Sequence, residues 1–223
     1  MFDSQPRQLH SYGMQAVAQY AVLDPEPPSD FLTASEFLDW LEPKIHADLI
    51  SGQIFMHSPV SFKHADLLNF VDPLMRLYVE EKKLGKVYRE VVAIRLNERH
   101  VFLPDLSFFS NEQVPNLKPN FAPFAPKLVV EALSPSSADR DRHQKFAAYE
   151  DNGVEEYWIL DPEQFLHRFY RRSGNILREY SSLSEDLIES QVIPGFYLRR
   201  SWLNQSPQPE VKGCLAEILV RPV

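Results

Sequence analysis

The sequence is poor in cysteine and glycine and contains no long hydrophobic stretch. Cys214 is the only cysteine among 223 residues, which excludes a disulfide framework and a multi-cysteine zinc site and suits a reducing cytoplasm. The longest apolar runs, such as residues 127–133, are far shorter than the ~20 residues that span a bilayer. No charged-then-apolar leader opens the chain. We therefore expect a cytoplasmic protein that does not enter a membrane.

Several well-known catalytic and nucleotide-binding motifs are missing as well. The seven glycines form neither GxGxxG nor GxxxxGK[ST], and neither HExxH nor GxSxG occurs. Dinucleotide-binding, P-loop, zinc-protease and nucleophile-elbow functions therefore have no support in the sequence. The formal net charge of -8 and the pI near 5.4 argue against broad adhesion to nucleic acid, although they leave room for a local basic cleft.

The composition that remains is that of a soluble globular protein. Hydrophobic residues make up 44% of the chain and charged residues 24%, and the length suits one domain with an appendage. Residues 1–30 are expected to form an irregular arm, because the Pro-rich run at residues 24–28 fits neither helix nor strand. Residues 31–223 are expected to form a single domain.

The hydrophobic period alternates between that of helices and that of strands. A capping box of Thr33 and Glu36 predicts a helix over 34–41. Apolar residues at helical spacing predict two more helices, over 61–83 and 138–151, with Gly85 beyond the end of the first and Ser136 or Ser137 capping the second. Strands are expected at 48–56 (a hairpin), 87–96, 101–103, 106–109, 127–133, 156–160, and in a hairpin of 166–170 with 176–180. This order predicts an α/β or α+β fold with a mixed central sheet flanked by helices.

Two carboxylates lie in strand-like segments among apolar residues. Asp105 follows Pro104 within residues 101–109, and Glu131 lies within residues 128–133. Carboxylates are seldom buried unless they are paired or bind a cation, because removing the charge from water is costly. Two of them converging from adjacent strands would form an oxygen site for Mg²⁺ or Mn²⁺. The alternative is that each lies at a strand edge and meets solvent or an arginine.

A lysine on the following helix offers a third polar group. Lys145 belongs to the predicted helix that leaves the Glu131 strand, so that its ammonium group could reach back over the end of that strand. The alternative for a single helical lysine is a solvated helix face, and position alone does not decide between them.

Taken in order, these residues resemble a known family. The series reads Pro104-Asp105, then Glu131-Ala132-Leu133-Ser134-Pro135-Ser136, then Asp141-Arg142-x-x-Lys145-x-x-x-Tyr149, then Gly153-Val154-x-Glu156-Tyr157-Trp158-x-Leu160-Asp161-Pro162. It resembles the Uma-two family of putative restriction endonucleases, within the PD-(D/E)XK nuclease superfamily, over roughly residues 33–170. The ordered combination is far more specific than any one of its parts.

The resemblance implies a restriction-endonuclease-like core and a set of site residues. Asp105 corresponds to the Asp of the PD motif and Glu131 to the second acid, and both would bind the metal. Many superfamily members carry a lysine two residues after the second acid, where this chain has Leu133; the resemblance therefore assigns the catalytic lysine to Lys145. Asp48 takes the place of a family glutamate, with a shorter side chain.

His64 matches a histidine that the family commonly carries at the start of the long helix. Two roles remain open for it: contact with a phosphate or the active-site water, or a purely structural role.

The function that the resemblance implies is metal-dependent hydrolysis of DNA phosphodiester bonds by an endonuclease that uses Mg²⁺ or Mn²⁺. A homodimer is expected, because two active sites related by a twofold axis are the simplest means of cutting both strands. The rival interpretation is an inactive module on the same fold that binds nucleic acid or protein; the acidic net charge, the shortened Asp48 and the displaced lysine favour it. A metal-dependent hydrolase with another substrate is a third interpretation. The sequence shows no base-reading element, so DNA specificity is open.

Overall fold

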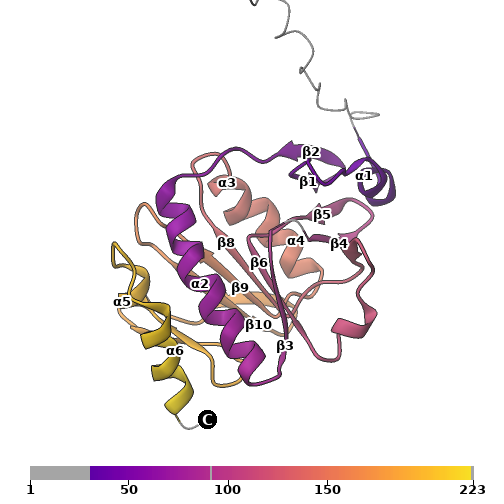
Figure 1. Cartoon of the computed structure of the whole chain (residues 1–223). Coiled ribbons are helices and arrows are strands. Elements are labelled where there is room, and N and C mark those ends of the chain that lie inside the picture. The colour runs from indigo at the N-terminus through magenta and orange to yellow at the C-terminus, as the bar shows by residue number, and fades with distance from the viewer. Residues whose placement is uncertain (1–30, 91, 222–223) are drawn as a thin grey trace, which may run out of the picture.

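Two mixed β-sheets and the helices packed on them make up most of the chain (Figure 1). The computed structural model describes residues 31–90 and 92–221, and the arm expected at residues 1–30 lies outside the described residues. None of the helices in the described residues is both long and apolar enough to span a membrane.

The larger sheet has six strands in the order β11-β10-β9-β8-β6-β3. They are β3 (Gly85–Arg89), β6 (Leu106–Ser110), β8 (Leu128–Ala132), β9 (Glu156–Leu160), β10 (Arg168–Ser173) and β11 (Ile176–Glu179). Strands β8 and β9 run parallel while the other neighbours are antiparallel. Every residue of β8 and β9 is buried, which explains why these strands are apolar apart from one glutamate each, Glu131 and Glu156. The prediction of a mixed central sheet is confirmed.

The second sheet has five strands in the order β2-β1-β5-β4-β7. They are β1 (Ala47–Ile50), β2 (Gln53–Met56), β4 (Ala93–Asn97), β5 (His100–Phe102) and β7 (Phe121–Ala122). The expected hairpin at 48–56 is present as β1 and β2. The single strand expected over 87–96 is wrong, because β3 pairs with β6 in one sheet whereas β4 pairs with β5 and β7 in the other. Periodicity cannot reveal such a change of partner, since an apolar run has the same pattern in either sheet.

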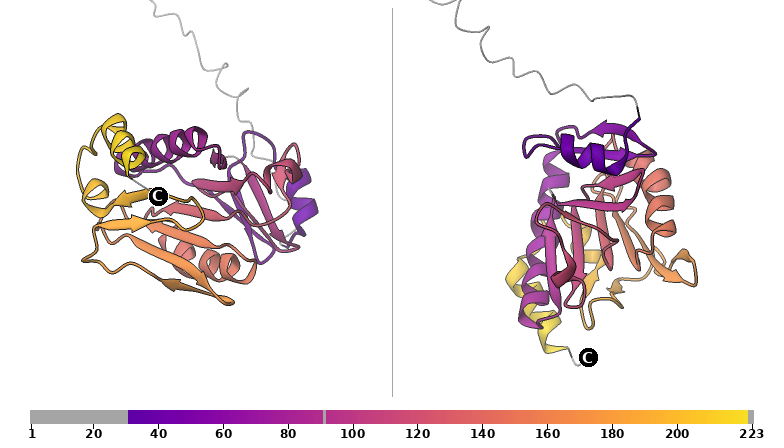
Figure 2. Two further views of the ribbon diagram at one scale, coloured as in Figure 1. Left: turned by 90° about the horizontal axis from the view of Figure 1, so that it is seen from below. Right: turned by 90° about the vertical axis from the view of Figure 1, so that its right-hand side faces the viewer.

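Helices cover both faces of the six-stranded sheet (Figures 1 and 2). Helix α2 (Phe62–Glu81) lies on one face together with the C-terminal helix α6 (Val211–Val220), and its apolar residues pack on alternate residues of β6, β8 and β9. The opposite face carries the helical run of α3 (Ala138–Arg140), a π-helical turn (Asp141–Lys145) and α4 (Phe146–Asp151). This run is the crossover that joins the parallel strands β8 and β9.

The helix boundaries follow the predictions with local corrections. Helix α1 (Ala34–Trp40) has the predicted capping box of Thr33 and Glu36. At the end of α2 the left-handed residue is Lys83, with φ 54°, whereas Gly85 begins β3; the glycine therefore does not cap the helix. Ser137 occupies the N-cap of α3 but makes no side-chain cap bond.

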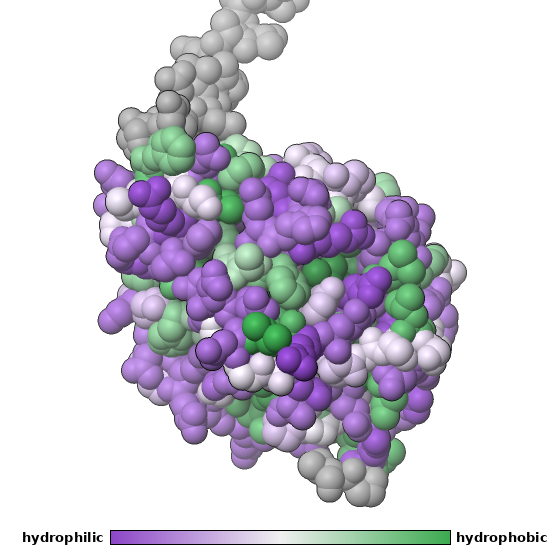
Figure 3. Space-filling view, turned by 180° about the vertical axis from the view of Figure 1, so that it is seen from behind, coloured by the Kyte–Doolittle hydropathy of each residue, from purple (hydrophilic) through white to green (hydrophobic). Residues whose placement is uncertain are grey.

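Residues 111–126 hold a 3₁₀ turn (Val114–Asn116) and the short strand β7. The segment after residue 180 forms β12 (Leu187–Glu189), β13 (Tyr197–Arg199), α5 (Arg200–Leu203) and α6. On the face opposite to that of Figure 1, hydrophobic side chains are interspersed among hydrophilic ones (Figure 3). Scattered exposure of this kind is usual for a protein surface.

A buried histidine fixes the loop that follows β9 and makes stability sensitive to acid. The Asp161 backbone N–H donates to His167 Nδ1 at 3.0 Å, which requires the neutral ring. Burial, with Arg200 nearby, lowers the pKa of His167 to about 4. Between about pH 6.5 and 4, His167 binds a proton in the unfolded chain but not in the folded chain. The unfolding free energy therefore decreases as the pH is lowered through this range.

We expect protonation of His167 in the unfolded chain to lower the unfolding free energy by about 2.5 kcal/mol when the pH is lowered from 7 to about 4.5. Urea unfolding at both pH values should show that the His167→Gln variant lacks this decrease in unfolding free energy. An equal loss of stability in the variant and the wild type would contradict the prediction.

Candidate active site

The four residues predicted as catalytic come together in one cavity of about 380 Å³. Asp48 lies on β1, Asp105 immediately before β6, Glu131 on β8 and Lys145 at the end of the π-helical turn. The cavity is therefore formed where one end of the six-stranded sheet meets the second sheet and the helical run.

The two predicted metal ligands face each other across adjacent strands. Leu106 of β6 pairs with Val130 of β8 in antiparallel register, so that Asp105 and Glu131 are the next residues to come opposite each other. Asp105 Oδ2 accepts a hydrogen bond from the Ala132 N–H at 2.7 Å. The strand register thus places both carboxylates at the same end of the sheet.

Glu131 is buried on the face of β8 that carries the helical run. Tyr149 Oη and Lys145 Nζ both donate to its Oε1, at 2.9 and 3.0 Å. Burial raises the pKa of Glu131 well above its usual value, and the nearby carboxylates add to this, while the Lys145 charge opposes it. Both bonds fall on Oε1, and Oε2 is therefore the oxygen suited to another ligand.

Lys145 is the buried cation at the centre of the acidic cluster. Its Nζ lies 2.9 Å from Asp48 Oδ2, 3.0 Å from Glu131 Oε1 and 3.5 Å from Asp141 Oδ1. Burial favours the neutral amine, but the three carboxylates outweigh it and raise the pKa of Lys145 well above its usual value. Lys145 is therefore protonated, and the alternative of a solvated helix face is wrong.

Asp48 holds Lys145 in place. Its Oδ1 accepts from the Leu103 N–H at 2.8 Å, and its Oδ2 contacts His57 Nε2 at 3.1 Å in addition to Lys145. Burial alone would raise the pKa of Asp48, but the Lys145 charge and the His57 hydrogen bond lower it to about 2. Both oxygens of this shorter acid are thus engaged by protein groups.

Sequence reasoning assigned no role to Asp141, Tyr149 or His57. Asp141 and Tyr149 are spaced by four residues on either side of Lys145, and this i, i+4 pattern was the signal that could have identified them. Asp141 is buried, its Oδ1 has no hydrogen-bond partner, and burial raises its pKa. The π-helical turn that brings Asp141 and Lys145 inward has no such signal, although turns of this kind are frequent at functional sites.

His64 lines the same cavity from the first turn of α2. Its Nε2 lies 3.5 Å from Asp105 Oδ2, and the Ser61 hydroxyl caps its backbone N–H at 3.2 Å. Burial works against protonation, but the hydrogen bond and charge of Asp105 raise the pKa of His64 overall. The structure thus places His64 beside one of the predicted metal ligands.

The donor set fits a hard divalent cation that keeps most of its water. In the described part of the chain, no three histidine, cysteine, aspartate or glutamate side chains are arranged as a ready-made metal site. Mg²⁺ binds proteins through one or two carboxylates and retains several waters, so that Asp105 and Glu131 suffice.

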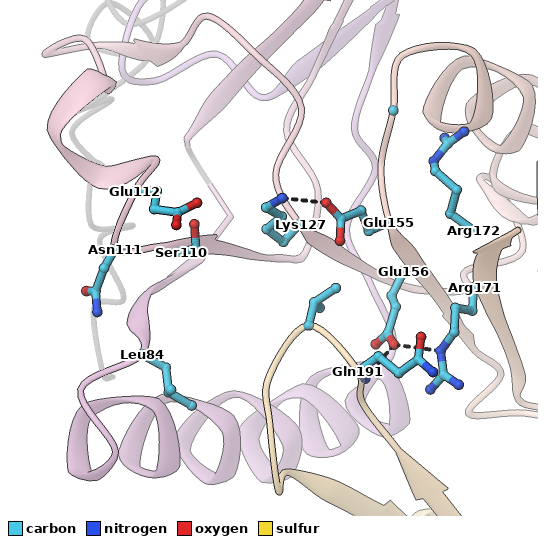
Figure 4. Close-up of a pocket in the computed structure, with 12 residues that line it drawn as sticks. Leu84, Ser110, Asn111, Glu112, Lys127, Glu155, Glu156, Arg171, Arg172 and Gln191 are labelled. Atoms are coloured by element: carbon cyan, nitrogen blue, oxygen red, sulfur yellow. Dashed lines mark hydrogen bonds and ion pairs between the residues drawn. The ribbon is translucent and has the colours of Figure 1, made fainter. Parts of the chain in front are cut away.

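A larger cavity of about 680 Å³ lies at the opposite ends of β8 and β9 (Figure 4). Four of its charged groups are engaged with one another: Lys127 pairs with Glu155, and Arg171 Nε donates to Glu156 Oε1 at 3.1 Å. Glu156 also accepts from the Ser190 hydroxyl and the Gln191 N–H. These contacts tie the loop before β13 to the sheet and indicate a structural role.

Comparisons with known proteins agree with this architecture. A family model described as Uma2, putative restriction endonuclease, matches residues 34–201. An uncharacterized protein of Synechocystis sp., sll1609, is 26% identical over 148 residues, which cover 65% of this chain and 82% of that protein. The crystal structure of a putative nuclease of the DUF820 group from Anabaena variabilis is similar in fold, with a TM-score of 0.66 and 19% identity over 77% of this chain and 97% of that one.

Proposed function

We propose that this chain, which belongs to the Uma2 family of putative restriction endonucleases, is a nuclease that hydrolyses DNA phosphodiester bonds with Mg²⁺ or Mn²⁺. The observation that carries the proposal is the position of Asp105 and Glu131, opposite each other on adjacent strands, with protonated Lys145 beside Glu131. Two carboxylates and a cation at one end of a mixed sheet suit a reaction in which negative charge develops on a phosphate.

Each residue has a distinct part in this mechanism. Asp105 and Glu131 would hold the divalent cation, which when bound polarises the phosphate and lowers the pKa of water. Lys145 stays protonated, so that it can donate hydrogen bonds to a water or a phosphate oxygen but cannot accept a proton. Asp48 and Tyr149 orient Lys145 and Glu131 respectively. The site as a whole would place a water in line with the phosphorus–oxygen bond that breaks.

The proposal is tested by incubating the purified protein with supercoiled plasmid, linear duplex and single-stranded DNA. We expect cleavage with Mg²⁺ or Mn²⁺ and none with EDTA. Intact DNA in every reaction, from protein that still binds the duplex, would overturn the proposal in favour of a binding module on this fold.

We also propose a homodimer, located in a reducing cytoplasm where the buried Cys214 stays a free thiol. Light scattering after size exclusion should give about twice the chain mass of 25.9 kDa, because two active sites related by a twofold axis are the simplest means of cutting both strands. A monomer mass at micromolar concentration and in the presence of duplex DNA would contradict the dimer.

A further inference from the structure

Two arginines border the acidic cavity without an acidic partner. Arg89, the last residue of β3, and Arg140, the last residue of α3, both line the cavity. Neither takes part in any ion pair recorded between described residues. Arg142, by contrast, lies two residues beyond Arg140 and is paired with Asp161 at 3.1 Å. The charges of Arg89 and Arg140 are therefore available to a ligand.

The register of the sheet places Arg89 at the same end of the sheet as the metal-binding acids, with its side chain on the α2 face, where it contacts Asn69. Arg89 pairs with Leu106 of β6, and Leu106 pairs with Val130 of β8. Because neighbouring strands are about 4.8 Å apart, the Arg89 backbone lies one strand beyond Asp105 and two strands from Glu131. Arg140 approaches from a different element, one residue before Asp141 in the helical run.

Each guanidinium group is held by a contact that leaves its charge intact. Arg89 Nη1 donates to Asn69 Oδ1 at 3.1 Å. The Arg140 guanidinium carbon lies 5.3 Å from the centre of the Phe55 ring, and its Nε is buried without a hydrogen-bond partner. Buried donors in proteins are normally satisfied, so the Arg140 Nε, which has no acceptor among the described residues, is free to donate to a ligand. Both side chains are thus pre-oriented for an anion.

The charge balance of the cavity requires such groups. When ionised, Asp48, Glu90, Asp105, Glu131 and Asp141 outweigh Lys145 and one bound divalent cation by two units of negative charge. A polyanion would then meet repulsion at the site unless cations stood beside it. Arginine suits this position, since its planar fork donates two hydrogen bonds to one phosphate.

We propose that Arg89 and Arg140 bind backbone phosphates of the DNA strand next to the bond that is cleaved. This inference rests on the proposed function and adds the residues that hold the substrate. Both are substrate-binding residues, and their contacts are independent of base sequence.

The test measures affinity for a fluorescent 20-base-pair duplex by anisotropy at several salt concentrations, with Ca²⁺ as the cation. The variants are Arg89→Ala, Arg140→Ala and Arg140→Lys. Arg178→Ala is the matched control. Arg178 is exposed on β11 outside the cavity, and its substitution removes the same charge. Circular dichroism melts confirm that each variant is folded.

We expect Arg89→Ala and Arg140→Ala each to bind the duplex about tenfold more weakly than the wild type. The slope of log affinity against log salt concentration should be reduced by about one. Arg140→Lys should keep the slope while losing part of the affinity, because the charge remains but the fork does not. Arg178→Ala should leave the slope unchanged.

Two other outcomes would overturn the inference alone: unchanged affinity and slope in the cavity variants, or an equal loss in Arg178→Ala, which would indicate general electrostatics. Wild-type protein that neither binds the duplex nor cuts plasmid would overturn the proposed function along with the inference.

Discussion

Glu131→Gln is expected to lower the rate of DNA cleavage about a thousandfold while the protein stays folded. The substitution keeps the shape of a buried side chain but removes the negative charge that faces Asp105 across the strands. Loss of charge complementarity at a metal-assisted reaction centre typically costs this much. The glutamine can still accept hydrogen bonds from Tyr149 and Lys145, which contact Glu131 in the wild type.

The measurement is the initial rate of plasmid cleavage at saturating Mg²⁺, together with a urea unfolding curve for each protein. Glu112→Gln is a suitable control, because it removes the same charge from an exposed residue of the other cavity. A Glu131→Gln rate within a few-fold of the wild type would show that this carboxylate is not part of the reaction.

Lys145→Met is expected to destabilise the metal-free protein by about 3–5 kcal/mol at pH 7, since removing one member of a buried ion cluster leaves unpaired charges behind. Three carboxylates, those of Asp48, Glu131 and Asp141, lie within 3.5 Å of the ammonium group. Without it, burial and mutual repulsion raise their pKa values in the folded state. At these carboxylates the folded variant then binds more protons than the unfolded chain, so its stability deficit relative to the wild type shrinks as the pH falls from 7 toward about 5.

Lys127→Met provides the comparison for this variant. Lys127 pairs with Glu155 at a partly exposed position, where the loss of an ion pair costs at most about 1 kcal/mol. Urea unfolding of both variants at pH 7 and about pH 5.5 measures the difference. A Lys145→Met protein as stable as the wild type at pH 7 would contradict the role of Lys145 as the counter-ion of the cluster.

The individual groups of the site were accessible from the sequence. Glu131 stood out because a carboxylate within an apolar run needs a partner, and it is indeed buried and bonded to Lys145. The position of Lys145 on the next helix allowed it to reach back to the end of the strand. Asp105 was identified by the same strand-like setting, whereas Asp48 came from the family resemblance alone, and the family match confirms that resemblance.

The pairing and packing of the strands and helices could not be predicted from the sequence. Nothing in residues 87–96 indicated that the chain leaves one sheet at Arg89 and enters the other at Ala93, because both halves carry the same alternation. The contact of Lys145 with Asp48 depends on how the β1–β2 hairpin packs against the helical run. Such long-range contacts are set by tertiary packing, which local propensity and periodicity do not encode.

The central claim is that Asp105 and Glu131 form one site for a divalent cation, and calorimetric titration of Mn²⁺ tests it most directly. Wild-type protein, Asp105→Asn and Glu131→Gln are titrated under identical conditions, each with and without a duplex oligonucleotide. The account predicts that the wild type binds Mn²⁺ and that each single substitution abolishes this binding. Binding of unchanged affinity in either variant, or no binding by the wild type even with DNA present, would contradict it.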